Sequence, residues 1–280
     1  MAHLLLPALF AIFVWWFSTG IVLYLDRLAP RTFKWSMLGA TILLIGAIVS
    51  LRWISRDTTT LGAYAGFACA VFAWAWQELS FYTGFVTGPR PLPCPGNARG
   101  WQRFGYALGC SLYHELAIAG SALCVAAASW GAPNQVATWT FVTFWVLHES
   151  ARLNVFLGVA NLNEEFLPAH MAFLRSYMTK RSLNGLFPVS VTLSTIAGTL
   201  VFMQVFQPGE TASTAAGHVF VGSIIAVATL EHWFLVVPLP AALLWRWSLD
   251  SAQRTNPVMA LESLPVANGP TPRFQFGRSP

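Results

Sequence analysis

The sequence predicts an all-α fold, a polytopic membrane bundle of about seven transmembrane helices. Three observations predict it. Hydrophobic residues make up 55% of the 280 residues and charged residues only 10%, a composition outside the range of soluble domains. Apolar stretches long enough to cross a bilayer recur along the chain, and positive charge gathers in alternate connections between them.

Seven segments reach the roughly 20 residues that are needed to cross the hydrocarbon core. They are residues 4–25, 33–54, 61–86, 104–130, 135–157, 185–206 and 214–237. The first is longer than the apolar part of a signal peptide and has no basic segment before it, so we interpret it as a retained span. The last is expected to continue through Pro238 and Pro240 to Trp247 with a kink, because proline removes a backbone donor.

The distribution of Lys and Arg predicts the orientation. If the spans alternate in direction, 14 of the 16 basic residues, Arg152 among them, fall on one side, and only Arg52 and Arg56 fall on the other. Positive loops stay in the cytoplasm, so we expect the N-terminus outside and the C-terminus inside. Basic loops beside spans also explain the net charge of +5. We therefore expect contact with membrane lipid and no nucleic-acid binding.

Two inner connections are longer than turns. Residues 87–103 are rich in proline and glycine and predict a rigid loop. In residues 158–184, Pro168 is expected to open a short helix with an apolar face, which would lie on the membrane surface or pack on the bundle as a connector. We expect residues 1–250 to form the transmembrane domain and residues 251–280 to be a disordered cytoplasmic tail.

Four spans each carry a glutamate, and in three of them a histidine stands beside it. Ionisable side chains within a membrane are costly and mark candidate functional sites. Counted at about 1.5 Å per residue from the inner ends, three of the four positions lie roughly 12–15 Å above the inner face. The fourth joins them if the last helix continues past its prolines. We therefore expect one polar pocket, with ligand-binding candidates Glu78, His114, Glu115, Glu149, Glu231 and His232.

Three kinds of site remain open for these groups. The first is a divalent metal site at Glu78, His114, Glu115, Glu231 and His232. In the second, a neutral histidine ligates the metal of a tetrapyrrole whose ring packs on aromatic walls. In the third, Glu and His join helices by hydrogen bonds. The Glu-x-x-His spacing of di-iron bundles is absent after each glutamate, which argues against oxidase-type chemistry.

Polar residues near the inner face form a second set of candidates. They would close the pocket from the inner side if the two long loops meet there, although solvated loop charge would explain them equally well. They are Arg90, Asn154, Asn161, Glu165 and His170.

Several strings between residues 74 and 240 resemble the PuhE-type family of photosynthetic complex assembly proteins (photosynthetic complex assembly protein 2). They are WQELSFYTGFVTGPR, LYHELAIAG, ARLNVFLGVANLNEEFLPAHMAFLRSYM, LFPVSVTLS and EHWFLVVPLP. The resemblance implies a multi-pass protein of the bacterial inner membrane that supports reaction-centre assembly and bacteriochlorophyll supply. The implied partners are reaction-centre or pigment-biosynthesis proteins. It carries no catalytic assignment, and the family's basic residue near His148 argues against a ligand role for that histidine.

The leading hypothesis is thus a photosynthetic complex assembly factor with an intramembrane Glu/His pocket. The alternative is a membrane metal-dependent enzyme that acts on a pigment or another lipid-soluble substrate. The implied cofactor is a tetrapyrrole under the first hypothesis and a divalent metal under the second.

Overall fold

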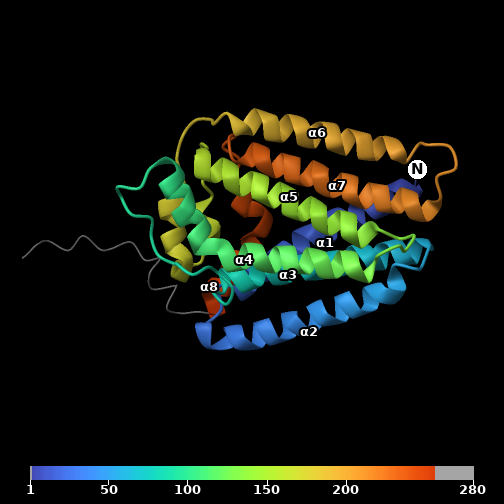
Figure 1. The fold of residues 1–280 in the computed structure, drawn as a ribbon, viewed down its shortest axis with the longest axis horizontal. Coiled ribbons are helices and arrows are strands. Elements are labelled where there is room, and N and C mark those ends of the chain that lie inside the picture. The colour runs from blue at the N-terminus through green and yellow to red at the C-terminus, as the bar shows by residue number, and fades with distance from the viewer. Residues whose placement is uncertain (1, 256–280) are drawn as a thin grey trace, which may run out of the picture.

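The computed structural model describes residues 2–255, which form a bundle of long helices (Figure 1). In chain order these are α1 (Ala2–Leu25), α2 (Pro30–Ile54), α3 (Thr60–Tyr82), α4 (Gly100–Ala128), α5 (Val136–Leu157), α6 (Leu186–Gln204), α7 (Ala212–Phe234) and α8 (Arg246–Thr255). Short 3-10 helices lie at Glu164–Phe166 (η1), Ala169–Tyr177 (η2) and Ala241–Trp245 (η3). Each of the seven predicted segments coincides with one of α1 to α7, and the described residues form no strand, so the all-α prediction is confirmed.

The chain is a membrane protein with a helical bundle. Within residues 2–255, five helices are long and apolar enough to cross a membrane, namely α1, α2, α4, α6 and α7. Helices α3 and α5 are of similar length but carry Glu78 and the polar residues from His148 to Arg152 in their later halves. These residues lower the hydropathy of both helices. The count of seven spans and the orientation therefore stay predictions.

Helix α3 lies in the middle of the bundle and contacts α1, α2, α4, α5 and α7. Its buried residues include several that are small, namely Gly62, Ala63, Gly66, Ala70 and Ala73. Small residues let helix backbones approach closely, which is how helices associate where lipid competes for apolar contact. Helices α2 and α6 lie on the outside, against α3 and α7 respectively (Figure 1).

Local signals in the sequence set several helix ends. Pro30 occupies the first turn of α2, where its missing N–H costs nothing. The Thr59 hydroxyl accepts a hydrogen bond from the Gly62 N–H and caps α3. Thr211 and Thr214 form a reciprocal capping box at the start of α7.

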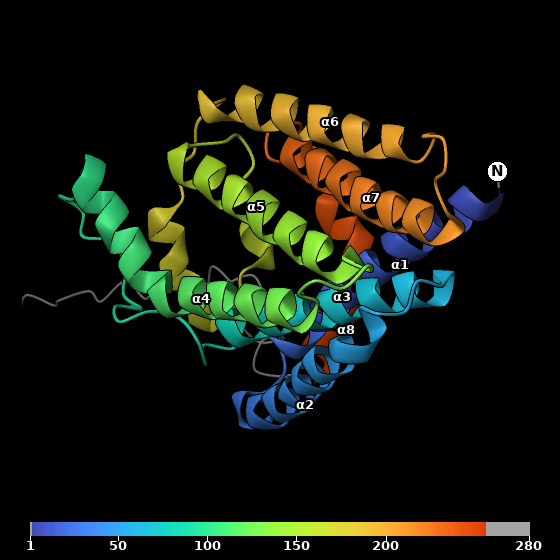
Figure 2. The ribbon, with the colours of Figure 1, turned by 45° about the vertical axis from the view of Figure 1, so that its right-hand side comes forward.

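The loop between α3 and α4 packs directly against α4. The His114 N–H donates to the Thr87 carbonyl (2.9 Å), and the Arg90 N–H donates to the Gly109 carbonyl (2.9 Å). Gly88 lies so close to α4 that a Cβ there would meet backbone atoms of that helix. Helix α4 is bent (Figure 2), and a foreign backbone that engages a helix in this way is a recognised cause of bending.

The two long inner connections meet, which was the condition for the second set of candidates to lie together. The Cys94 N–H donates to the Ser176 hydroxyl (2.8 Å), and Arg90 Nη1 donates to the Tyr177 hydroxyl (2.9 Å). The helix expected after Pro168 exists as η2. Met171 on it is buried, so η2 packs on the bundle as a connector.

The end of α7 differs from the prediction. The helix stops at Phe234, before both prolines. The Asn161 side chain donates to Phe234 O (3.0 Å), at the end of the helix, and to Val237 O (2.7 Å), just beyond it. These bonds replace the helical continuation. The chain then returns through η3 into α8, which packs against α1. There the Ser248 hydroxyl donates to Gly20 O (2.6 Å). Residues 251–255 thus belong to α8 rather than to the expected tail, and residues 256–280 lie outside the described residues.

Candidate functional site

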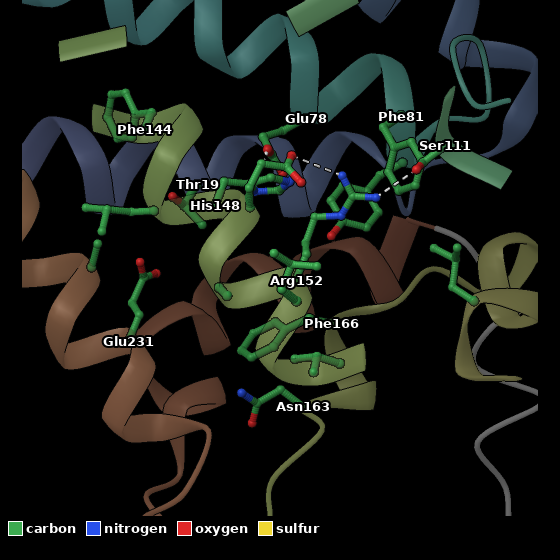
Figure 3. Close-up of a pocket in the computed structure, with 18 of the residues that line it drawn as sticks. Thr19, Glu78, Phe81, Ser111, Phe144, His148, Arg152, Asn163, Phe166 and Glu231 are labelled. Carbon is green, nitrogen blue, oxygen red and sulfur yellow. Dashed lines mark hydrogen bonds and ion pairs between the residues drawn. The ribbon is translucent and has the colours of Figure 1, made fainter. Parts of the chain in front are cut away.

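The bundle encloses a cavity of about 740 Å³ between α1, α3, α4, α5 and α7 (Figure 3). Its volume falls within the range of small-molecule sites, about 300–1,000 Å³. Aromatic side chains form much of the wall, including Trp15, Trp74, Phe81, Phe104, Phe144, Trp145, Phe156, Phe166 and Trp245. Trp74 and Phe144, both in this wall, stack on each other with ring centroids 5.6 Å apart and planes at 15°.

All four predicted glutamates line this cavity. Glu78 comes from α3, Glu115 from α4, Glu149 from α5 and Glu231 from α7. The structure therefore brings together acidic groups that are up to 153 positions apart in the sequence. Glu231 lines the cavity although α7 ends only three residues later. The chain that follows the helix returns to the cavity, where Leu235 and Trp245 also line it.

Arg152 joins two of the glutamates. Its Nη1 contacts Glu115 Oε1 and lies 3.3 Å from Glu149 Oε1, and its Nη2 donates to the Ser111 hydroxyl (2.9 Å). Arg152 was expected among the basic residues of the inner connections, and this expectation is wrong. The residue lies inside α5, five residues before the helix ends. Its position three residues after Glu149, within an apolar span, was the signal that could have identified it.

His148, like Arg152, lines the cavity but was not among the ligand-binding candidates from the sequence. Its Nδ1 lies 3.4 Å from Glu78 Oε1, too poorly aligned for a hydrogen bond, and its ring packs edge-on against Trp74. In the described residues, His148 Nε2 and Glu78 Oε1 are buried without a hydrogen-bond partner. A buried polar atom without a partner is unusual, so this pair marks a place where a bound molecule or water would be stabilised.

Glu231 differs from the other three glutamates. It extends from α7 toward the space that Glu78, His148 and Arg152 border (Figure 3). Within residues 2–255 no ion pair or hydrogen bond involves its carboxyl group. An ionised carboxylate without a partner is costly in apolar surroundings. Glu231 therefore needs either a proton or a donor from a bound molecule.

The two remaining histidine candidates face other groups. His114 is buried behind Phe81, with ring centroids 4.5 Å apart, and does not line the cavity. His232 reaches the cavity wall, but its Nδ1 lies 2.7 Å from the Ala228 carbonyl and its Nε2 lies 3.0 Å from the Ser150 hydroxyl. Because a carbonyl only accepts, Nδ1 donates to Ala228, while Nε2 contacts the Ser150 hydroxyl, which itself donates to the Ser190 hydroxyl (2.9 Å). His232 thus joins α7 to α5.

The metal-ligand set that the sequence suggested is not assembled. In the part of the chain that the structure describes, no three His, Cys, Asp or Glu side chains are grouped so that they could hold a metal ion. The reason is visible in the two histidines, since Phe81 stands between His114 and the cavity and both ring nitrogens of His232 have partners. Glu78, Glu115 and Glu231 come from three helices and do not converge on one point. We therefore derive no metal chemistry from this site.

The inner-loop candidates hold the loops in place and do not line the cavity. Arg90 bonds Tyr177 and loop carbonyls, Asn154 bonds Ser190, Asn161 caps α7, and His170 Nε2 lies 2.7 Å from Tyr82 O. Glu165 contributes its backbone carbonyl, which accepts from Arg27 Nη2 (2.7 Å). The loop side chains that do close the cavity are Leu162, Asn163, Phe166, Leu167, Leu174, Tyr177 and Met178.

Comparison with known proteins places this architecture in a family. A family model described as "Protein of unknown function (DUF3623)" matches residues 1–256. The chain belongs to this family. It is 38% identical over 252 residues to an "Uncharacterized 30.4 kDa protein in puhA 5'region" of Rhodobacter capsulatus, a match that covers 89% of this chain and 92% of that protein. No solved structure matches.

Proposed function

We propose that this member of the DUF3623 family binds a tetrapyrrole pigment, or a precursor of one, in its intramembrane cavity and supports the assembly of photosynthetic complexes. The observation that carries the proposal is the cavity itself. It combines a volume of about 740 Å³ with aromatic walls and with carboxyl groups on several sides. That combination suits a large, flat, mainly apolar molecule with a few polar substituents.

The chemistry of the wall favours this ligand class. Aromatic rings recur around the wall, among them Trp74 and Phe144, and such rings make favourable stacking or edge contacts with a planar ring. The carboxyl group of Glu231 has no partner among residues 2–255. A protonated carboxyl can donate to a carbonyl substituent, while an ionised one can accept from an N–H or O–H group. Arg152 supplies a guanidinium at the other side of the cavity.

The Rhodobacter capsulatus relative supports a photosynthetic role. Its name places it in the 5′ region of puhA. The resemblance to PuhE-type assembly proteins adds the narrower proposal of reaction-centre assembly and bacteriochlorophyll supply. On this proposal the protein crosses the bacterial inner membrane several times and meets reaction-centre or pigment-biosynthesis proteins there.

A binding experiment tests the proposal. The purified protein, in lipid nanodiscs, is titrated with bacteriochlorophyllide a while tryptophan fluorescence is recorded, since Trp15, Trp74, Trp145 and Trp245 line the cavity. We expect saturable quenching. The variant Ala228→Phe, which places a ring in the cavity from α7, is expected to weaken binding by at least about tenfold.

Ala127→Phe is the matched control, because Ala127 is exposed on α4 and faces away from the cavity. It should bind as the wild type does. The proposal is wrong if the wild type shows no saturable quenching, or if Ala228→Phe binds as tightly as Ala127→Phe while both remain folded. The assembly role is tested in a phototrophic host, where Ala228→Phe should lower the absorbance of assembled photosynthetic complexes at unchanged protein level.

A further inference from the structure

The cavity reaches the lipid side of the bundle along the seam between α4 and α5. Leu108 on α4 and Leu153 on α5 line the cavity, yet they are 42% and 38% exposed. The two helices diverge toward this end of the seam (Figure 2). The side chains of Arg152 and Glu149 are also about one third exposed here, at 32% and 33%. A molecule in the cavity could thus be reached sideways from the membrane.

Farther along the same seam lies a second hollow of about 330 Å³. Residues of α4 and α5 alone line it, namely Ala119, Ala122, Leu123, Val125, Ala126, Thr138, Phe141, Val142 and Trp145. We call it the seam groove. Trp145 lines both the seam groove and the main cavity, so the two spaces are neighbours separated by one side chain.

The seam groove is mainly apolar. Thr138 is the one polar residue in its lining, and its hydroxyl is bonded to the Ser129 hydroxyl (2.7 Å). The indole N–H of Trp145 is the other hydrogen-bonding group among the lining side chains. Between Ala119 and Ala126, the first and last α4 residues of the lining, the helix rises by roughly 10 Å at 1.5 Å per residue. A mainly apolar groove of this length suits part of a hydrocarbon chain.

We infer that the ligand has two parts, a polar-edged ring held in the main cavity and a hydrocarbon tail that leaves past Trp145 and lies in the seam groove. This inference rests on the proposed function and deepens it, because it specifies a tail-bearing ligand. The ring lies at the level of Glu115, Glu149 and Arg152, and the tail follows α4 and α5 toward the predicted outer side.

A tail attached to the ring fits the groove better than a free lipid chain does. Lipid tails are as apolar as the groove, so a free chain gains little by leaving the bilayer. When the ring is already bound, its tail has a high effective concentration beside the groove. Binding of the tail then costs less translational and rotational entropy than binding of a free chain. The groove therefore adds affinity for a tail-bearing ligand over its tail-less counterpart.

The test compares two probes in nanodiscs. Bacteriochlorophyll a carries a long isoprenoid tail, and bacteriochlorophyllide a lacks it. We expect the wild type to bind the tail-bearing probe about tenfold more tightly. Ala126→Phe, which fills the seam groove, should lose this preference while it keeps its affinity for the tail-less probe. Ala119→Phe fills the other end of the groove and serves if Ala126→Phe does not fold. Ala127→Phe, on the neighbouring exposed position, should keep the preference.

The outcomes separate the inference from the proposed function. Equal affinity of the wild type for both probes, or a preference that survives in Ala126→Phe and Ala119→Phe, would overturn the inference and leave ring binding intact. The inference is equally overturned if the groove variants only displace a co-purified lipid. Failure of the wild type to bind either probe would overturn both proposals. A preference lost in the groove variants and kept in Ala127→Phe supports the inference.

Discussion

Four glutamates and one arginine line the cavity. Among its lining residues in the described part of the chain, Arg152 is the only Lys or Arg, and it contacts Glu115 and Glu149 directly. An unpaired charge in such a place costs far more than an exposed one. Arg152 therefore makes it possible for α4 and α5 to bring two carboxyl groups together.

Removing this arginine should destabilise the fold. Breaking a fully buried ion pair costs about 3–5 kcal/mol. Because the Arg152 side chain is 32% exposed, we expect Arg152→Gln to lower the free energy of unfolding by less, on the order of 2 kcal/mol. That corresponds to a Tm lower by about 4–8 °C in a thermal melt.

The matched control removes the acids as well. Arg152→Gln combined with Glu115→Gln and Glu149→Gln removes the arginine together with the two carboxylates that it contacts, so it should recover most of the lost stability. A single variant as stable as the wild type, or a triple variant no better than the single one, would contradict this account of the cluster.

Asp26 provides a pH-dependent contribution outside the spans. Burial raises the pKa of Asp26 from its ordinary value of 3.8 to about 8, although the neighbouring Arg27 works in the opposite direction. The folded protein thus holds a proton that the unfolded chain releases near pH 4. The stability linked to this proton is fully present below about pH 4 and is lost as pH rises through about 8.

Asp26→Asn mimics the protonated side chain at every pH. We expect its advantage in Tm over the wild type to grow from pH 4 to pH 8 and then to level off. Asp57→Asn is a control of opposite sign, because hydrogen bonds from Thr59 lower the pKa of exposed Asp57. Its stability should fall below that of the wild type as pH rises toward about 4 and then stay below it by a constant amount. Parallel Tm profiles for the wild type and Asp26→Asn would show that Asp26 does not titrate in this way.

Residue chemistry was only partly predictable from the sequence. The glutamates stood out because an acidic residue in an apolar run is conspicuous, and all four line the cavity. Whether a neighbouring histidine faces the same way depends on helix rotation and on what packs beside it. Adjacent helical residues point about 100° apart, so nothing in the sequence showed that His148 would meet Glu78 while Phe81 covered His114.

At the scale of elements, the loop between α3 and α4 depends on one glycine. A Cβ at Gly88 would lie 2.8 Å from the backbone nitrogen of Ser111 and closer still to the Gly109 carbonyl. Backbone atoms cannot move aside as a flexible side chain can. Gly88→Ala must therefore push the loop away from α4, at an expected cost of about 1–3 kcal/mol.

Gly96 in the same loop is the control. A Cβ there would meet nothing within 4 Å, so Gly96→Ala should change stability by no more than about 0.5 kcal/mol. Thermal melts of the two variants decide the matter. Equal Tm values would mean that the loop does not press against α4 as closely as the structure describes.

The elements themselves were more predictable than their ends. Apolar length locates a span because backbone groups must be satisfied within it, and each of α1 to α7 coincides with a predicted segment. The end of α7 was missed because Asn161, from a distant loop, binds the last carbonyls and replaces the helical continuation. The packing of α8 against α1 likewise depends on contacts, such as Ser248 with Gly20, that no local pattern encodes.

At the scale of the whole molecule, the two long helices that are not among the five candidate spans, α3 and α5, also contribute most of the polar side chains of the site. Helix α3 occupies the centre, α5 packs against it, and the pair contributes Glu78, His148, Glu149 and Arg152 to the cavity. Neighbouring helices shield these polar side chains from lipid, so α3 and α5 can carry residues that a lipid-facing helix could not. A low hydropathy is therefore expected for both, even if they cross the membrane.

Labelling of single cysteines tests this crossing and the predicted orientation together. In a background in which Cys69, Cys94, Cys110 and Cys124 are replaced, Thr58→Cys and Asn97→Cys place one exposed thiol in the connection before α3 and one in the connection after it. Even without Arg152, basic residues lie overwhelmingly on the side of Asn97, so the positive-inside rule puts this end in the cytoplasm. In spheroplasts, an impermeant maleimide should label Thr58→Cys at once and Asn97→Cys only after the membrane is opened. Reversed labelling would invert the topology, and immediate labelling of both thiols would mean that α3 does not cross.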